Sequence, residues 1–245
     1  NYDRARKDYL DKQSSKDSVD KQFAYNADFH SYNLINNDSP GSTNRFYGSP
    51  IIKLTPGTTH GTHVAGIIAA ERNNNTGIEG VADNVLIMPI VATTVTGDER
   101  DKDIANAIKY AVDNGASIIN MSFSKLFSSE KYLVDNAVKY AEKKNVLIIH
   151  AAGNDGVNID SAINYHYPIA IYDDGSRASN FITVGWNRAL FDYRLAHPYG
   201  DYGKQNVDLL APGSDIYSCV PNNQYDFKSA TSMATPMVSG VAALL

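Results

Sequence analysis

Apolar runs of strand length alternate with helical patterns along this chain, and that alternation limits its fold most. Strand-type runs occupy residues 85–92 (VLIMPIVA), 116–122 (ASIINMS), 145–152 (NVLIIHAA), 181–185 (FITVG) and 207–211 (VDLLA). Between the first three runs, residues 101–115 and 129–145 carry apolar side chains at helical spacing. Strands that are apolar throughout are typical of a parallel sheet covered on both faces. We therefore predict an α/β fold, a three-layer αβα sandwich around a mostly parallel sheet.

Three segments at predicted strand ends or helix starts carry groups with chemical potential. They are TTHGTHVAGIIAA (58–70), HAAGNDG (150–156) and SATSMATPMVSGVAALL (229–245). In parallel α/β sheets, ligands bind beyond the carboxyl ends of the strands. No GxGxxG or GxxxxGK[ST] loop follows any of the runs, so the sequence does not support a nucleotide site.

Composition excludes several other functions. The 245 residues include 22 Lys and Arg against 27 Asp and Glu, a net charge of −5 without a basic stripe, which argues against nucleic-acid binding. Cys219 is the only cysteine, which excludes an intrachain disulfide and a CxxC metal site. No apolar run reaches the length of a membrane span and no signal peptide is present. Both ends look cut, and we expect a piece of a longer protein.

Ser232, His60 and Asn154 supply complementary chemistry. A serine hydroxyl becomes a strong nucleophile when a base such as histidine takes its proton. A serine at a helix N-terminus also lies where backbone N–H groups favour negative charge, and a nearby Asn can donate a second hydrogen bond. Taken singly, each residue has a structural interpretation: a helix cap at His60, a turn at Asn154 and an N-cap at Ser232.

The segments HGTHVAG, AAGN and TSMATPMVSGVAAL resemble the histidine, oxyanion-asparagine and serine blocks of the subtilisin-like serine proteases, in the order of that family. The resemblance covers about residues 46–245 and implies a serine endopeptidase with the subtilisin-like αβα fold. By the same resemblance, His60 is the general base, Ser232 the nucleophile and Asn154 the oxyanion donor. His63 matches a packed structural position.

The resemblance also implies a peptide-binding surface. The segment Ser122, Phe123 and Ser124 matches the strand that pairs with the substrate backbone, and Ala151, Ala152 and Gly153 match a wall of the primary specificity pocket. Asp155 falls at the rim of that pocket, where its carboxylate would favour basic side chains.

The third triad member, an aspartate in a D-[ST]-G block, is not found in this sequence. Asp28 lies 32 residues before His60, but its context AYNADFHSYN lacks the apolar strand that should bury such a carboxylate. We expect the aspartate upstream of Asn1, with residues 1–45 as a charged, polar insertion or surface segment of the same domain and residues 46–245 as the peptidase domain, truncated at both ends. Because loss of this aspartate costs about 10⁴ in turnover, the fragment alone should be nearly inactive.

The remaining expectations concern ligands and location. No cofactor and no metal are predicted; Asn73–Gly77 resembles a calcium loop of some family members, but a plain turn is the alternative, because calcium sites usually include carboxylates. The partners implied are a polypeptide substrate and an N-terminal propeptide, and the resemblance implies a secreted or cell-envelope protein. Two rivals are a catalytically impaired, peptide-binding relative and an α/β-hydrolase esterase; the latter requires a G-x-S-x-G elbow with the serine before the histidine.

Overall fold

The computed structural model describes residues 52, 58–92, 99–188 and 195–245. The chain divides into two compact units, residues 1–53 with 93–99 and residues 54–92 with 100–245. The second unit carries all the helices and strands given below. Residues 1–45, including Asp28, lie outside the described residues, so their role as an insertion stays a prediction.

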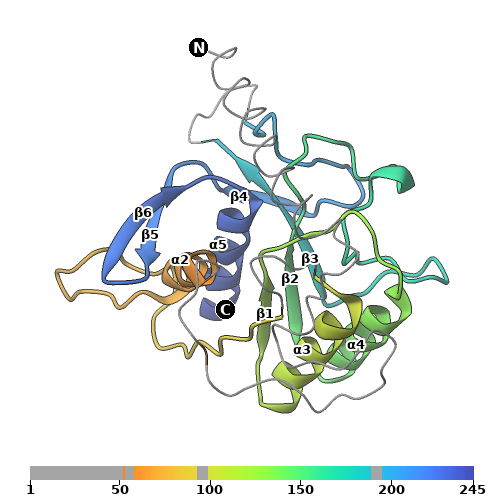
Figure 1. Ribbon diagram of the computed structural model, residues 1–245, viewed down its shortest axis with the longest axis horizontal. Helices are drawn as coiled ribbons and strands as arrows, with labels where there is room; N and C mark the ends of the chain where they lie inside the picture. Colours follow the sequence, from red (N-terminus) through yellow and green to blue (C-terminus); the bar gives the residue numbers. More distant parts are fainter. Residues whose placement is uncertain (1–51, 53–57, 93–98, 189–194) are drawn as a thin grey trace, which may run out of the picture. The chain divides into compact units, whose positions relative to one another are not determined.

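Four strands form the central parallel sheet of the second unit. They are β1 (Ile118–Met121), β2 (Leu147–Ala151), β3 (Phe181–Asn187) and β4 (Leu209–Pro212), in that spatial order (Figure 1). Every neighbouring pair is parallel, with Ile118 opposite Leu147 and Val184 opposite Leu209. The predicted parallel sheet is therefore confirmed.

One face of the sheet is covered by α3 (Asp101–Asp113) and α4 (Lys131–Lys143). The predicted apolar face of α3, with Ile104 and Ile108, is buried against α4 and the sheet. The other face is covered by α5 (Thr231–Leu244), which contacts all four strands. Adjacent residues of β2 divide between the layers: Ile148 packs on the side of α3 and α4, and Ile149 on the side of α5. This is the predicted three-layer αβα arrangement.

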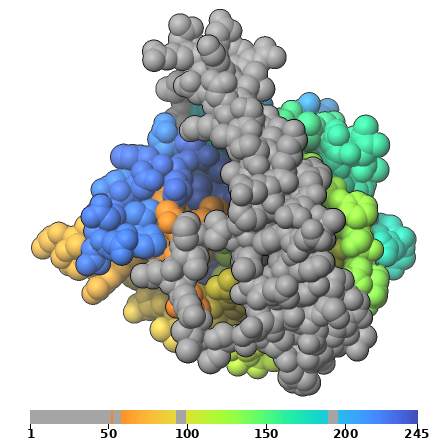
Figure 2. All heavy atoms as spheres, in the orientation of Figure 1, coloured from red at the N-terminus to blue at the C-terminus, as the bar shows by residue number. Residues whose placement is uncertain are grey.

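Helix α2 (Thr58–Ala69) packs beside α5 and against a hairpin of β5 (Ile216–Val220) and β6 (Gln224–Lys228). In Figure 2 the orange atoms of the 58–92 region adjoin the blue atoms of the C-terminal region, which places two distant parts of the sequence side by side. A short 3₁₀ helix spans Ala162–Asn164. None of the helices in the described ranges has both the length and the apolar character of a membrane span.

Two predictions of local structure were incomplete or wrong. The antiparallel hairpin β5–β6 was not predicted; its strands mix polar and aromatic residues, and the chain reverses through left-handed Asn222 and Asn223. Residues 85–92, predicted as a buried strand, form no strand, and Leu86 is fully exposed. The run pairs with none of the described strands, and the outermost of them, β1, pairs only with β2.

Candidate active site

His60 and His63 both lie on α2 but have different surroundings. His63 is fully buried, and its Nε2 atom lies 3.1 Å from both the Ile216 and the Asp226 carbonyl oxygens of the β5–β6 hairpin. His60 is exposed, in the first turn of the helix. The structure therefore agrees with His63 as a packing residue and leaves His60 accessible to a reacting group.

Ser232 is the second residue of α5 and is almost buried. Its hydroxyl donates a hydrogen bond of 2.9 Å to the Ser122 carbonyl, and the Ser122 hydroxyl donates one of 2.9 Å to the Ser232 carbonyl. This reciprocal pair fixes the start of α5 to the chain just beyond β1. The position at a helix N-terminus places Ser232 in the positive end of the helix dipole.

The packing of α2 on α5 brings His60 and Ser232 to one end of the helix pair. Val64, one turn after His60, lies in the same buried apolar cluster as Met233, the residue after Ser232. The first turns of both helices therefore meet at the carboxyl-end side of the sheet, beside the residue that follows β1. The Ser232 hydroxyl itself bonds to the Ser122 carbonyl.

Asn154 is held next to the nucleophile by its side-chain oxygen. Oδ1 accepts hydrogen bonds from the Thr231 backbone N–H (2.9 Å) and from the Thr231 hydroxyl (3.0 Å). Since both bonds use the oxygen, the Nδ2 donor of the amide faces away from Thr231. The Asn154 amide, after β2, therefore lies next to the residue that precedes Ser232 at the start of α5. An oxyanion site requires such a donor near the nucleophile.

The described groups around His60 include no carboxylate that acts on it. The crowding of protein atoms around the partly accessible ring lowers the pKa of His60, and the charges of His63 and Lys228 lower it further. A triad aspartate would have the opposite effect, because a nearby negative charge favours the imidazolium. Among the described residues, the causes that shift the pKa of His60 are burial and positive charges.

The predicted substrate-binding residues surround this site. Ser122 follows β1 directly and bonds to Ser232, while Phe123 is half-buried and packs edge-on against His150 at a centroid distance of 6.3 Å. The chain at Lys125 then pairs with Tyr167 in a short antiparallel bridge. The structure thus brings Ser122–Ser124 and the buried Ala151–Gly153 segment to the same region, around Asn154 and Ser232.

A cluster of three ionisable residues beside Asn154 was not predicted. His166 Nδ1 lies 2.6 Å from Asp201 Oδ2, and His166 Nε2 lies 3.2 Å from Asp155 Oδ2. Burial by itself would lower the pKa of His166, but Asp155 and Asp201 outweigh it and raise the pKa to about 9. The Asp155 carboxylate, predicted to favour basic substrates, therefore already faces a cation of the protein. No periodicity or spacing in the sequence connects these three residues.

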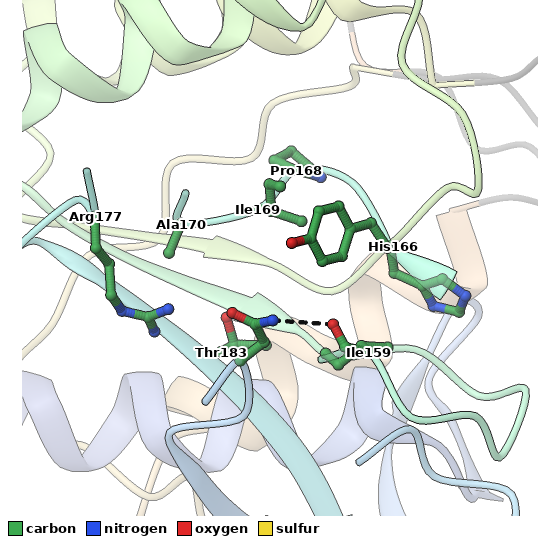
Figure 3. A pocket seen from close by; sticks show the side chains of 9 residues that line it. Ile159, His166, Pro168, Ile169, Ala170, Arg177 and Thr183 are labelled. Carbon is green, nitrogen blue, oxygen red and sulfur yellow. Dashed lines mark hydrogen bonds between the residues drawn. The ribbon is translucent and has the colours of Figure 1, made fainter. Parts of the chain in front are cut away.

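A small pocket borders His166, one of the three residues of the ionic cluster. Its lining includes Tyr165, His166, Pro168, Arg177 and Asn206. In Figure 3, His166 and Arg177 lie at opposite ends of the set of lining residues. The Asn206 side chain donates a hydrogen bond to the Ile159 carbonyl at 3.0 Å. One guanidinium nitrogen of Arg177, Nη2, donates to both carboxylate oxygens of Asp208, at 2.7 and 2.8 Å. The pocket shares His166 with the ionic cluster but not the catalytic side chains.

The loop Asn73–Gly77, which resembles a calcium loop but was expected to be a plain turn, is exposed. Asn73, Asn75 and Gly77 have left-handed backbone conformations, and Asn74 Oδ1 accepts the Thr76 N–H at 2.9 Å. That bond and the left-handed residues set the shape of the turn. The only described group of His, Cys, Asp and Glu side chains with metal-ligand proximity is Asp155, His166 and Asp201.

Comparison with known proteins agrees with this geometry. The family model described as "Subtilase family" matches residues 17–245. The chain belongs to the subtilase family. Its relatives include the "Thermophilic serine proteinase" of Bacillus sp. (strain AK1), 42% identical over 186 residues, which are 76% of this chain and 42% of the relative. The "Cell wall-associated protease" of Bacillus subtilis (strain 168) is 39% identical over 76% of this chain and 19% of its own length.

Solved structures show the same fold. The prenylagaramide maturation protease PagA superposes with a TM-score of 0.61 at 34% identity, over 76% of this chain and 63% of that one. Like the relatives above, PagA is thus matched over less than two thirds of its own length. This subtilase chain combines the family's histidine and serine helices with an Asn-bearing loop whose ionic support was not evident in the sequence.

Proposed function

We propose that the protein containing this chain is a serine endopeptidase that hydrolyses polypeptides through an acyl-enzyme. The observation that carries the proposal is the pair of bonds from Thr231 to Asn154, because it joins the oxyanion donor to the residue before the nucleophile. The serine proteinases among the relatives support the same reaction.

In the proposed reaction, Ser232 Oγ attacks the scissile carbonyl carbon while His60 takes the hydroxyl proton. The oxyanion of the tetrahedral intermediate accepts hydrogen bonds from the Asn154 side chain and the Ser232 backbone N–H. Collapse breaks the C–N bond, and His60 returns its proton to the leaving amine. A water molecule then attacks the acyl-enzyme, again losing a proton to His60, and the carboxylic acid product leaves Ser232.

We also propose that a carboxylate outside the described residues completes the triad. Two observations support it: the groups that shift the pKa of His60 all lower it, and an exposed apolar run at 85–92 faces no described strand although it has strand composition. A strand upstream of the sequence, ending in the aspartate, would provide both a pairing partner and the missing charge. The chemistry needs no cofactor.

The substrate is proposed to bind as an extended peptide along Ser122–Ser124, with main-chain hydrogen bonds giving affinity and Ala151–Gly153 bounding the first side-chain pocket. An N-terminal propeptide stays a prediction from the family. The relative called a cell wall-associated protease supports a secreted or cell-envelope location. Fractionation of the producing cells tests this, and recovery in the cytosolic fraction would contradict it.

A fluorophosphonate probe on the full-length protein tests the catalytic role directly, because the probe reacts only with an activated serine. We expect labelling that disappears in Ser232→Ala and drops sharply in His60→Ala. Ser239→Ala is the matched control, since Ser239 is also a buried serine of α5 but bonds to Asn120 and Thr235. Labelling that does not depend on Ser232 would favour the alternative, a peptide-binding relative without catalysis.

A further inference from the structure

The loop that carries Asn154 is bound on both sides of the catalytic side chain to one buried residue, Asp201. The Asp201 backbone N–H donates to the Gly153 carbonyl at 3.1 Å, and Asp201 Oδ1 accepts the N–H groups of Asp155 and Val157, both at 3.0 Å. Asn154 therefore lies between two attachment points of the same residue. Its own side chain is oriented from the other direction, by Thr231.

The second carboxylate oxygen of Asp201 faces His166 at 2.6 Å, and neither side chain has meaningful contact with solvent: Asp201 is 0% and His166 2% exposed. An unpaired carboxylate at such a depth is strongly unfavourable, so a neutral partner would not hold it in place. The other nitrogen of His166 reaches Asp155 at 3.2 Å, in the residue after Asn154. A single imidazolium thus contacts both Asp201, which binds the backbone of the loop, and Asp155, which belongs to the loop.

The backbone at Gly153 fits tightly around this ion pair. Gly153 has φ +121°, and a Cβ placed there would lie 1.9 Å from His166 Nδ1 and 2.0 Å from Asp201 Oδ2. The ion pair therefore packs directly onto the peptide before Asn154, and a shift of either side chain moves the catalytic loop. The third ionisable neighbour, His150 of β2, is buried and stays neutral, because burial and the charge of His166 lower its pKa to about 3.

We propose that His166 is a positioning residue: held as an imidazolium between Asp155 and Asp201, it fixes the Asn154 loop in the geometry that stabilises the oxyanion. This rests on the proposed peptidase function. A metal ion in the same place is disfavoured, because both ring nitrogens already face carboxylates and the 2.6 Å separation leaves no room for an ion between Nδ1 and Oδ2.

The decisive experiment is a double-mutant cycle in the full-length enzyme with a peptide substrate. His166→Gln should lower kcat about 10- to 100-fold with KM nearly unchanged, as expected for a small displacement of a catalytic group. Asn154→Ala should lower kcat about 10²- to 10³-fold. Because His166 acts through Asn154, adding His166→Gln to Asn154→Ala should change kcat by less than about twofold.

The pH profile supplies a readout that simple structural damage would not give. The alkaline limit of kcat in the wild type should lie near the pKa of His166, about 9. Asp155→Asn removes the half-exposed carboxylate and keeps the buried pair, so the protein should fold and the limit should move to lower pH. Arg177→Gln is the matched control, since it breaks an ion pair at the other end of the same pocket and should move neither kcat nor the limit.

The outcomes separate the two proposals. Active wild-type enzyme with multiplicative effects of His166→Gln and Asn154→Ala overturns the positioning role and leaves the peptidase function standing. An unmoved alkaline limit in Asp155→Asn also overturns it, and a response of activity to a chelator or to added Zn²⁺ would replace the imidazolium by a metal site. A full-length wild type that neither cleaves peptides nor reacts with the fluorophosphonate overturns both.

Discussion

At the scale of single residues, two histidines on one helix have different surroundings. His63 closes the contact between α2 and the hairpin through two carbonyl oxygens, and burial lowers its pKa although these carbonyls act to raise it. His60 remains accessible in the same turn region. Substitution by Ala should therefore lower the stability of the fold at His63 and the activity at His60.

Replacing His63 by Ala should lower the free energy of unfolding by about 2–4 kcal/mol, because it leaves a cavity and two carbonyl groups without their donor. His60→Ala, the control on the same helix, should change the stability by less than about 0.5 kcal/mol, as is usual for exposed positions, while abolishing activity. Urea unfolding measures the first effect and peptide hydrolysis the second. Equal stability of the two variants would contradict the assignment of His63 to packing.

The candidate catalytic residues could be proposed from sequence because each lies in a contiguous block with its own local pattern. His166 and Asp201 could not, because their roles depend on contacts with the Asn154 loop that join chain segments dozens of residues apart. Nothing in the local sequence NYHYP distinguishes a buried imidazolium from a surface histidine. The same holds for the contact of Asp155 with His166, while the effect of Asp155 on substrate preference stays a prediction.

At the scale of elements, the helical spacing of apolar residues correctly predicted the two helices that cover one face of the sheet. The predicted helix over 101–115 corresponds to α3, which ends at Asp113 with Asn114 as its cap, and the helix over 129–145 corresponds to α4. The hairpin β5–β6 was missed because its aromatic row of Tyr217, Tyr225 and Phe227 is not a buried apolar face: Tyr217 and Phe227 stay exposed, so the hairpin lacks the apolar burial expected of a core strand.

The turn Asn73–Gly77 carries an element-scale prediction about metal dependence. Its shape is set by the Asn74–Thr76 bond and by left-handed residues, and Gly77 lies directly against the Tyr225 ring. Because these contacts define the turn without a cation, a chelator should leave the Tm unchanged, whereas Tyr225→Ala should lower it by several degrees. Differential scanning calorimetry with and without EDTA decides, and a lower Tm in EDTA restored by Ca²⁺ would establish a calcium site instead.

At the scale of the whole molecule, two buried histidines give stability an optimum in pH. The pKa of His166, about 9 in the folded chain, exceeds its ordinary value of 6.5, so its contribution is complete below pH 6.5 and is lost as the pH rises through 9. His150 has the reverse sign: its lowered pKa of about 3 means that its contribution is complete above 6.5 and declines as the pH falls below that value.

From these two groups we expect the free energy of unfolding to be greatest near pH 6.5 and to fall on both sides. His166→Gln should flatten the alkaline decline between pH 6.5 and 9 while leaving the acid decline, and His150→Gln should do the opposite if the variant folds. Urea unfolding at intervals of pH measures both. A wild-type stability that is constant from pH 6.5 to 9 would contradict a charged His166 in the folded protein.

The uncovered side of β1 has a consequence for handling the protein. Leu86 and Val91 are well exposed, and the outer edge of β1 has no partner among the described strands. An exposed apolar run and an unpaired strand edge are each a template for association with another chain. This chain expressed by itself should therefore self-associate as its concentration rises.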